Sequence, residues 1–295
     1  MKQLFTWPIY TDIMKNILVC TDFSKNAYCA LHYATRLFRD EICNFVILHS
    51  YNDRLTNSSY LLINEMEREN NLKVREEAME KNMELMHSIK RDSTGNNQFK
   101  TVTTELPLVQ AIKEQIEKQH IDLVVMGTEG KSGLSQRFFG RKTLSVIQHL
   151  STTPILIIPR ETDFSEPLSI DFATDFKMEP EIANFPILKA IVETYHSSIR
   201  FVHSGNEEDM ETSQWKNYRL LKETLENPNA AIEYLPTHLE VSRAIAEHMK
   251  ENHVDLLCMV KFKHQNWQFF REPVIKELDL HLRFPFLILQ SEKLK

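Results

Sequence analysis

The sequence has little glycine, little cysteine and no long apolar run. Its 295 residues include 6 Gly, 11 Pro and 4 Cys, and 42% are hydrophobic, which is typical of an ordinary globular protein rather than a disordered tail. No stretch approaches 18 uninterrupted apolar residues, so a membrane span is excluded. The opening residues also lack the apolar core of a secretory signal. We therefore expect a cytoplasmic protein with no membrane partner.

An excess of charge of one sign is also missing. The chain has 35 Lys and Arg against 41 Asp and Glu, a net charge of −6, and no basic face that would indicate a nucleic-acid partner. The twelve His form no HExxH pattern and the cysteines form no C-x2-C pair, so no metal site is expected. Buried reduced thiols are expected at Cys20, Cys29, Cys43 and Cys258.

The length suggests about two domains. In the first half, short β-branched runs alternate with longer helical patterns, which predicts βαβ crossovers and a parallel sheet. A long helix is expected over Tyr60–Arg91, and its Leu72, Met79 and Met86 lie seven residues apart. We expect the two methionines to pack in the core rather than to form a cofactor site. The expected strands are Asn16–Thr21, Asn44–Ser50, Phe99–Leu106, Asp122–Met126 and Ile155–Ile158.

The second half of the chain repeats the first. AIKEQIEKQHIDLVVM, residues 111–126, matches AIAEHMKENHVDLLCM, residues 244–259, at an offset of 133. Residues 136–158 then match residues 267–289 at an offset of 131. Repetition of this length indicates two copies of one α/β unit.

Domain boundaries follow from the repeat. We expect an N-terminal extension at residues 1–13, a first domain at 14–159 and a second at 160–295. The residues up to 159 have 19 Lys and Arg against 18 Asp and Glu, a net charge of +1, while the remainder has a net charge of −7. An anion site is therefore expected in the first domain.

Glycine is concentrated in one segment of the first domain. Four of the six glycines fall between Gly127 and Gly140, directly after an apolar strand. Ligands bind beyond the carboxyl ends of parallel strands, and glycine lets backbone N–H groups approach a phosphate. The segment has one acid, Glu129, against Lys131, Arg137, Arg141 and Lys142. This pattern favours a phosphate site, and a solvated loop with a basic rim is the alternative.

Two common phosphate motifs are absent, because Val125 stands where both Walker A and GxGxxG would need glycine. The segment matches G-x2-G-x9-G at Gly127, Gly130 and Gly140. Together with NILVCTDFSKNAYCALHYA at residues 16–34 and the later PILIIP, this motif resembles the universal stress protein family. The resemblance covers the chain as a tandem pair and is eroded in the second copy.

The resemblance implies an α/β fold with two tandem Rossmann-like domains. Each would have a five-stranded parallel sheet of order 3-2-1-4-5 flanked by helices. The last strands of the two domains would pair, giving an intramolecular pseudo-dimer, and further association into a homodimer is compatible with this arrangement.

An ATP-binding branch of that family carries the glycine motif, so the resemblance implies a site for ATP, alone or with Mg²⁺. Asp22 would meet the adenosine at the end of the first strand, and Val46 would contact the adenine. The residues from Gly140 onward would hold the phosphates. The implied contacts are Cys20, Thr21, Asp22, Val46, Met126, Gly127, Thr128, Gly130, Gly140, Arg141, Lys142 and Thr143.

The sequence departs from the family pattern after the last glycine. Arg141 replaces the usual Ser or Thr, and a hydroxyl returns at Thr143. Arg141 could itself hold a phosphate. The alternative role of Asp22 is that of a helix N-terminal acid near Ser24.

The second copy keeps Asp175 but loses the motif. Val260, Lys263 and Arg271 stand at the positions of the three motif glycines. Side chains at these positions would fill the space that phosphates need. We expect the second domain to act as a structural partner that does not bind ATP in this way.

Three functions remain open. The preferred one is an ATP-binding stress-response protein that acts with an unidentified protein partner. The alternatives are a nucleotide-free interaction scaffold and a nucleotide hydrolase. No nucleophile has a recognisable partner base, so we expect no enzyme beyond slow ATP hydrolysis, for which Glu129 is the candidate base.

Overall fold

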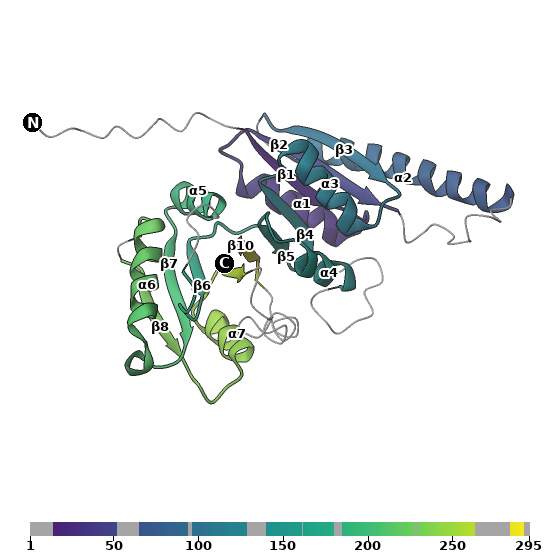
Figure 1. The fold of residues 1–295 in the computed structure, drawn as a ribbon. Helices are drawn as coiled ribbons and strands as arrows, with labels where there is room; N and C mark the ends of the chain where they lie inside the picture. The colour runs from purple at the N-terminus through teal and green to yellow at the C-terminus, as the bar shows by residue number, and fades with distance from the viewer. Residues whose placement is uncertain are drawn as a thin grey trace, which may run out of the picture.

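The strands of both halves form one sheet. The computed structural model describes residues 14–51, 65–93, 96–128, 140–160, 162–179, 185–227, 229–262 and 284–291. Within these residues ten strands lie in the order β3-β2-β1-β4-β5-β10-β9-β6-β7-β8 (Figure 1). Counted from the outer strand inward, each half has the order 3-2-1-4-5, and its neighbouring strands are parallel. The predicted fold class is confirmed.

The elements of the two halves correspond in order. The strands of the first half are β1 (Lys15–Cys20), β2 (Cys43–Ser50), β3 (Gln98–Thr104), β4 (Leu123–Gly127) and β5 (Ile155–Ile158). Its helices are α1 (Lys25–Leu37), α2 (Glu65–Asp92), α3 (Leu108–Gln119) and α4 (Arg141–His149). The strands of the second half are β6 (Ser169–Ala173), β7 (Ser198–Ser204), β8 (Ala231–Leu235), β9 (Leu256–Phe262) and β10 (Phe286–Ser291). Its helices are α5 (Pro186–Tyr195), α6 (Thr212–Thr224) and α7 (Val241–Glu251). Among the described helices, none is both long enough and apolar enough to span a membrane.

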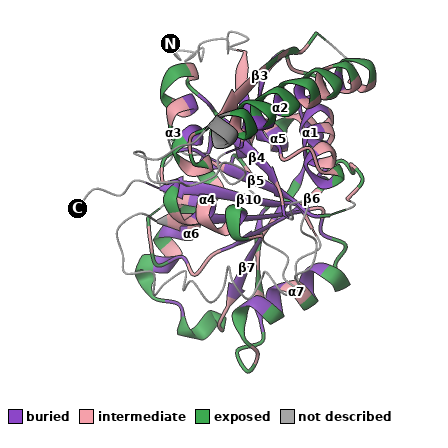
Figure 2. Ribbon diagram, turned by 90° about the vertical axis from the view of Figure 1, so that its right-hand side faces the viewer, coloured by how far each residue is buried: buried purple, intermediate pink, exposed green. Residues whose placement is uncertain are grey.

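Helices cover both faces of the sheet. Successive strand residues point to opposite faces, so Ile17 and Val19 pack with α1 and α2, while Leu18 packs with α3 and α4. In the second half, α5 and α6 lie on the same face of the sheet as α1 and α2, and α7 lies on the same face as α3 and α4. The strands are buried between helices whose outer surfaces are exposed (Figure 2).

The two halves meet along β5 and β10. These strands pair antiparallel, with Leu156 opposite Leu287, so the predicted pairing of the two fifth strands is present and neither is left as an open edge. On one face, the Tyr195 hydroxyl donates to the carbonyl oxygen of Leu37 (2.8 Å) at the end of α1 and lies 3.1 Å from that of Arg36. One hydrophobic cluster runs through both halves.

The predicted domain boundaries, residues 14–159 and 160–295, agree with this order of elements and stay a prediction. The expected N-terminal extension, residues 1–13, lies outside the described residues.

Helix α2 corrects one prediction about the core. Met79 is 48% exposed, so the prediction that it lies in the core is wrong, while Met86 packs against the core as predicted. Leu72, seven residues before Met79, is 56% exposed. The cause is that α2 is 28 residues long and projects past the edge strand β3 (Figure 1), and that a neighbouring helical stripe is the buried one. That stripe contains Val74, Ala78, Asn82 and Ile89.

Candidate functional site

The end of β1 leads into a tight turn that begins α1. Thr21 Oγ1 accepts a hydrogen bond from the Phe23 N–H (3.0 Å), and Asp22 Oδ1 accepts one from the Ser24 N–H (2.9 Å). Ser24 Oγ then caps α1 by accepting from the Ala27 N–H (3.1 Å). Phe23 has a positive φ of 61°, a conformation that costs a non-glycine residue about 1–3 kcal/mol. Side-chain hydrogen bonds on both sides hold the turn in this shape.

The second half builds the same turn. Thr174 Oγ1 accepts from the Phe176 N–H and Asp175 Oδ1 from the Lys177 N–H, both at 3.0 Å, and Phe176 has a φ of 55°. The turn therefore recurs where the motif glycines are absent. The bond from Asp22 to Ser24 serves the turn, in agreement with the alternative role considered for Asp22, and its contact with adenosine stays a prediction.

The N-terminal end of α4 carries two cations. Gly140 is the N-cap, and because it has no side chain it makes no side-chain cap bond. Arg141 and Lys142 are exposed in the first turn, which contains no acid. The first N–H groups of a helix have no intrahelical acceptor and carry partial positive charge. Arg141 and Lys142 add positive charge to this end of α4, and an anion is the group that complements it.

The cationic turn lies near the end of β1. Burial raises the pKa of the Cys20 thiol to about 12, while the charge of Lys142 acts in the opposite direction. Lys142 is therefore close enough to β1 to influence a group at its end. The high pKa keeps Cys20 protonated at neutral pH, so it is no nucleophile.

Thr143 ties α4 to the neighbouring strand. Its hydroxyl lies 3.2 Å from the carbonyl oxygen of Gly127, to which it donates, and 3.5 Å from that of Thr128. Gly140 donates its N–H to the Thr128 carbonyl as well (2.6 Å). Because the buried Thr143 hydroxyl points back to β4, Arg141 and Lys142 are the exposed groups of this turn.

Gly127 is glycine for a packing reason. A Cβ at this position would lie 2.8 Å from Nδ2 of Asn26 and 3.1 Å from its Cγ. A side chain here would therefore require Asn26 of α1 to move away from the end of β4, whether or not a phosphate binds nearby. Gly130 and Glu129, two other residues singled out in the sequence, lie outside the described residues.

Val46 lies in the core. It is opposite Leu18 in the middle of β2 and fully buried, whereas His49 and Ser50 occupy the carboxyl end of that strand. Ten of the positions implied to contact ATP lie together, around the ends of β1 and β4 and the start of α4. They are Cys20, Thr21, Asp22, Met126, Gly127, Thr128, Gly140, Arg141, Lys142 and Thr143.

His49 is a residue of this region to which the sequence assigned no role. Its Nδ1 lies 2.8 Å from the carbonyl oxygen of Thr21, and its ring centroid is 4.3 Å from that of Phe23. His203 holds the equivalent place in the second half, 3.0 Å from the carbonyl oxygen of Thr174. In the sequence, Leu48-His49-Ser50 recurs as Val202-His203-Ser204, and this recurrence is the signal that could have identified His49.

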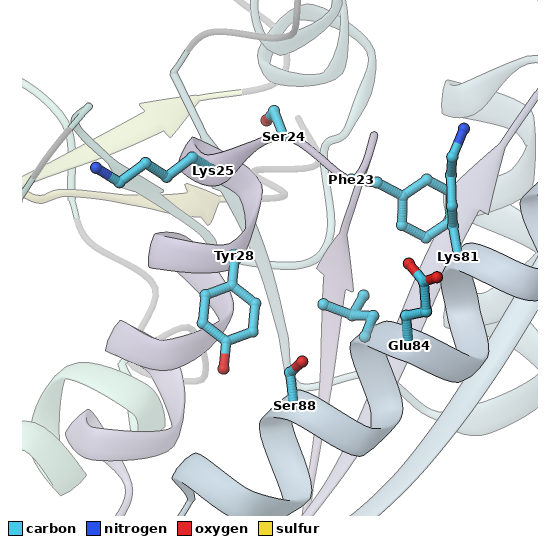
Figure 3. Close-up of a pocket in the computed structure, with 8 residues that line it drawn as sticks. Phe23, Ser24, Lys25, Tyr28, Lys81, Glu84 and Ser88 are labelled. Carbon is cyan, nitrogen blue, oxygen red and sulfur yellow. The ribbon is translucent and has the colours of Figure 1, made fainter.

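A groove of about 410 Å³ opens beside the β1–α1 turn, between α1 and α2 (Figure 3). In the second half, α6 covers the equivalent turn, because Gln214 Nε2 donates to the Asp175 carbonyl and Asn217 Nδ2 to the Phe176 carbonyl, both at 2.7 Å. The turn therefore borders a groove in the first half and is covered in the second. The groove is lined by Phe23, Ser24, Lys25, Tyr28, Lys81, Glu84, Leu85 and Ser88.

The second half carries charge where the first is apolar. Arg200 occupies the strand position of Val46, and its register partner Asp171 occupies that of Leu18. Asp171 is fully buried; its Oδ1 accepts from Arg200 Nε (3.0 Å), and its Oδ2 lies 3.1 Å from His248 Nε2. The same face of the sheet thus has different chemistry in the two halves.

Comparisons with known proteins agree with this architecture. Residues 14–159 match the model of the universal stress protein family. Universal stress protein MJ0577 of Methanocaldococcus jannaschii is 28% identical over 161 residues, covering 50% of this chain and 96% of that protein.

Two solved structures share the fold over both halves. A universal stress protein from Archaeoglobus fulgidus DSM 4304 covers 94% of this chain and 98% of its own, with a TM-score of 0.69 and 15% identity. The functionally unknown protein PA1789 from Pseudomonas aeruginosa PAO1 covers 95% and 94%, with a TM-score of 0.56 and 10% identity.

Proposed function

We propose that this chain, which belongs to the universal stress protein family through residues 14–159, binds ATP in its first half as part of a stress response. The second half is the structural partner of this site and does not bind ATP in the same way.

The first turn of α4 carries the proposal. Arg141 and Lys142 lie exposed at the positive end of a helix with a glycine N-cap, a combination that suits a phosphate group. These two side chains and the first-turn N–H groups would hold the phosphates. The β1–α1 turn at Asp22 would meet the nucleoside. ATP, when bound, supplies the negative charge that this turn lacks.

Calorimetric titration of ATP and of ADP, with and without Mg²⁺, tests the proposal. The wild-type chain is expected to bind ATP at one site with a micromolar dissociation constant. The double variant Arg141→Ala, Lys142→Ala removes two charged phosphate contacts and is expected to weaken binding at least about 10-fold, since one hydrogen bond to a charged group contributes about 1.5–3 kcal/mol.

A matched control separates local from general charge effects. Lys216→Ala with Arg219→Ala removes one lysine and one arginine from the exposed face of α6 and is expected to leave ATP affinity unchanged. Absence of binding by the wild type would contradict the proposal. Equal loss in both variants would show that the α4 turn is not the phosphate site.

A nucleotide-free interaction scaffold is the second candidate. It is favoured by the exposed apolar side chains of Leu72, Met79 and Met83 on α2, of which Met83 is 66% exposed, because exposed apolar groups of this kind mark protein contacts when they form a patch. Failure of the wild-type titration would move the interpretation to this candidate.

A further inference from the structure

Lys261 connects the second half to the helix of the candidate phosphate site. It lies near the end of β9, at the sequence position that Thr128 occupies in the first half, with the same offset of 133. The Lys261 side chain reaches the first half. Its Nζ donates hydrogen bonds to the carbonyl oxygens of Ile147 (2.5 Å), Gln148 (3.0 Å) and Leu150 (2.7 Å).

These carbonyls belong to the C-terminal end of α4, where the last carbonyl oxygens of a helix have no intrahelical N–H donor. An ammonium group has three donors and its charge complements the partial negative charge of this helix end. Burial lowers the pKa of Lys261 to about 8, and Lys113 contributes through repulsion. At neutral pH the charged form still predominates, so Lys261 caps α4 as a cation.

The same half also contacts the far end of α1. The Tyr195 hydroxyl donates to the carbonyl oxygen of Leu37 at the C-terminal end of that helix and lies 3.1 Å from that of Arg36. Helices α1 and α4 are the two that begin at the candidate site. Both are therefore held at the opposite end by a side chain of the second half.

We propose that Lys261 is a positioning residue for the nucleotide site. By fixing the C-terminal end of α4, it orders the first turn, where Arg141 and Lys142 lie, and the second half thereby sets how tightly the first half binds phosphate. This inference rests on the proposed ATP binding and names the residue that regulates that site.

Titration of ATP and adenosine into Lys261→Met tests this role. We expect ATP affinity to fall about 10-fold, within the usual range of coupling between sites. Adenosine affinity should stay unchanged, because adenosine has no phosphate to contact the first turn of α4. Lys261→Arg keeps the cation and should restore ATP affinity to within about threefold of wild type. Lys216→Met, which removes an exposed lysine on α6, is the matched control and should bind ATP like the wild type.

Thermal unfolding and hydrogen exchange of the α4 amides complete the experiment. All variants should unfold cooperatively, and exchange in α4 should be faster in Lys261→Met than in Lys261→Arg. If the wild type binds no ATP, the proposed function itself fails and this inference with it. If the wild type binds ATP and Lys261→Met binds it equally well, or loses ATP and adenosine in parallel, only the positioning role is overturned. Should Lys261→Met fail to fold, a loss of ATP affinity in Lys261→Arg equal to that of Arg141→Ala, Lys142→Ala would also overturn it.

Discussion

At the scale of single residues, one short motif builds the same turn in both halves of the chain. The Thr-Asp-Phe turn occurs in both halves with the same hydrogen bonds and the same positive φ at Phe23 and Phe176. The sequence showed that the motif repeats, but not that its hydroxyl and carboxylate bond to the backbone. A recurring pair of residues identifies a shared local structure, and the ligand has to be argued from residues that differ, such as Arg141.

Gly127 yields a prediction at this scale. Gly127→Ala would place a Cβ against the buried Asn26, and we expect a loss of about 1–3 kcal/mol in the free energy of unfolding, typical of overpacking. Denaturant unfolding of Gly127→Ala, with and without Asn26→Ser, measures this. The double variant should be more stable than the sum of the two single changes indicates. Additive losses would show that Asn26 does not make the contact.

The location of Val46 could not be read from composition alone. The sequence correctly predicted that Val46 lies in the second strand. How far its side chain lies from the edge of the sheet depends on the register between β2 and β1, in which Val46 is opposite Leu18. Register is fixed by contacts between segments that are far apart in the chain. The residues at the end of that strand, His49 and Ser50, are the ones that the fold brings to the edge of the sheet.

At the scale of strands and helices, most of the architecture followed from periodicity. The apolar runs predicted the five strands of the first half to within two residues at each end, and the repeat carried the same order into the second half. The buried face of α2 was the exception. The helix extends past the sheet, so Met79 is about half exposed, and the buried stripe contains Val74 and Ala78 instead.

The buried ion pair between Asp171 of β6 and Arg200 of β7 leads to a prediction about stability. Removing one partner from a buried ion pair leaves an uncompensated charge, so Arg200→Val should lower the free energy of unfolding by about 3 kcal/mol. The triple variant Asp171→Leu, Arg200→Val, His248→Gln copies Leu18, Val46 and Gln115 of the first half. It should unfold within about 1 kcal/mol of the wild type, since replacing every member of a buried ion cluster by an uncharged residue leaves no unpaired buried charge. Denaturant unfolding of both variants is the measurement, and equal destabilisation would argue against this account.

At the scale of the whole molecule, the buried thiols predict how stability depends on pH. Burial raises the pKa of Cys20 to about 12 and that of Cys43 to about 11, and raises that of Cys258 as well. A folded chain that keeps these protons while the unfolded chain loses them near pH 8.5 becomes less stable as pH rises.

We expect the free energy of unfolding to fall between about pH 9 and 10, below the range in which tyrosines titrate, by about 1.4 kcal/mol per pH unit for each thiol. Lys261, whose pKa is lowered, acts in the opposite direction between about pH 8 and 10.5 and offsets one of the three. Denaturant unfolding across this range measures the slope. Cys43→Ala should reduce it by about 1.4 kcal/mol per unit, and an unchanged slope would exclude Cys43 as a contributor.

The antiparallel pair β5–β10 joins two halves of a single polypeptide into one sheet. In an assembly of two identical subunits every substitution appears twice, at both symmetry-related sites. A fused pair has no such constraint: one gene can change either half alone, and the two are always made in equal amounts. The buried charges of β6 and β7 and the lysine that reaches across to α4 are changes of this one-sided kind. Covalent fusion thus permits a division of labour that a symmetric dimer of the same fold could not encode.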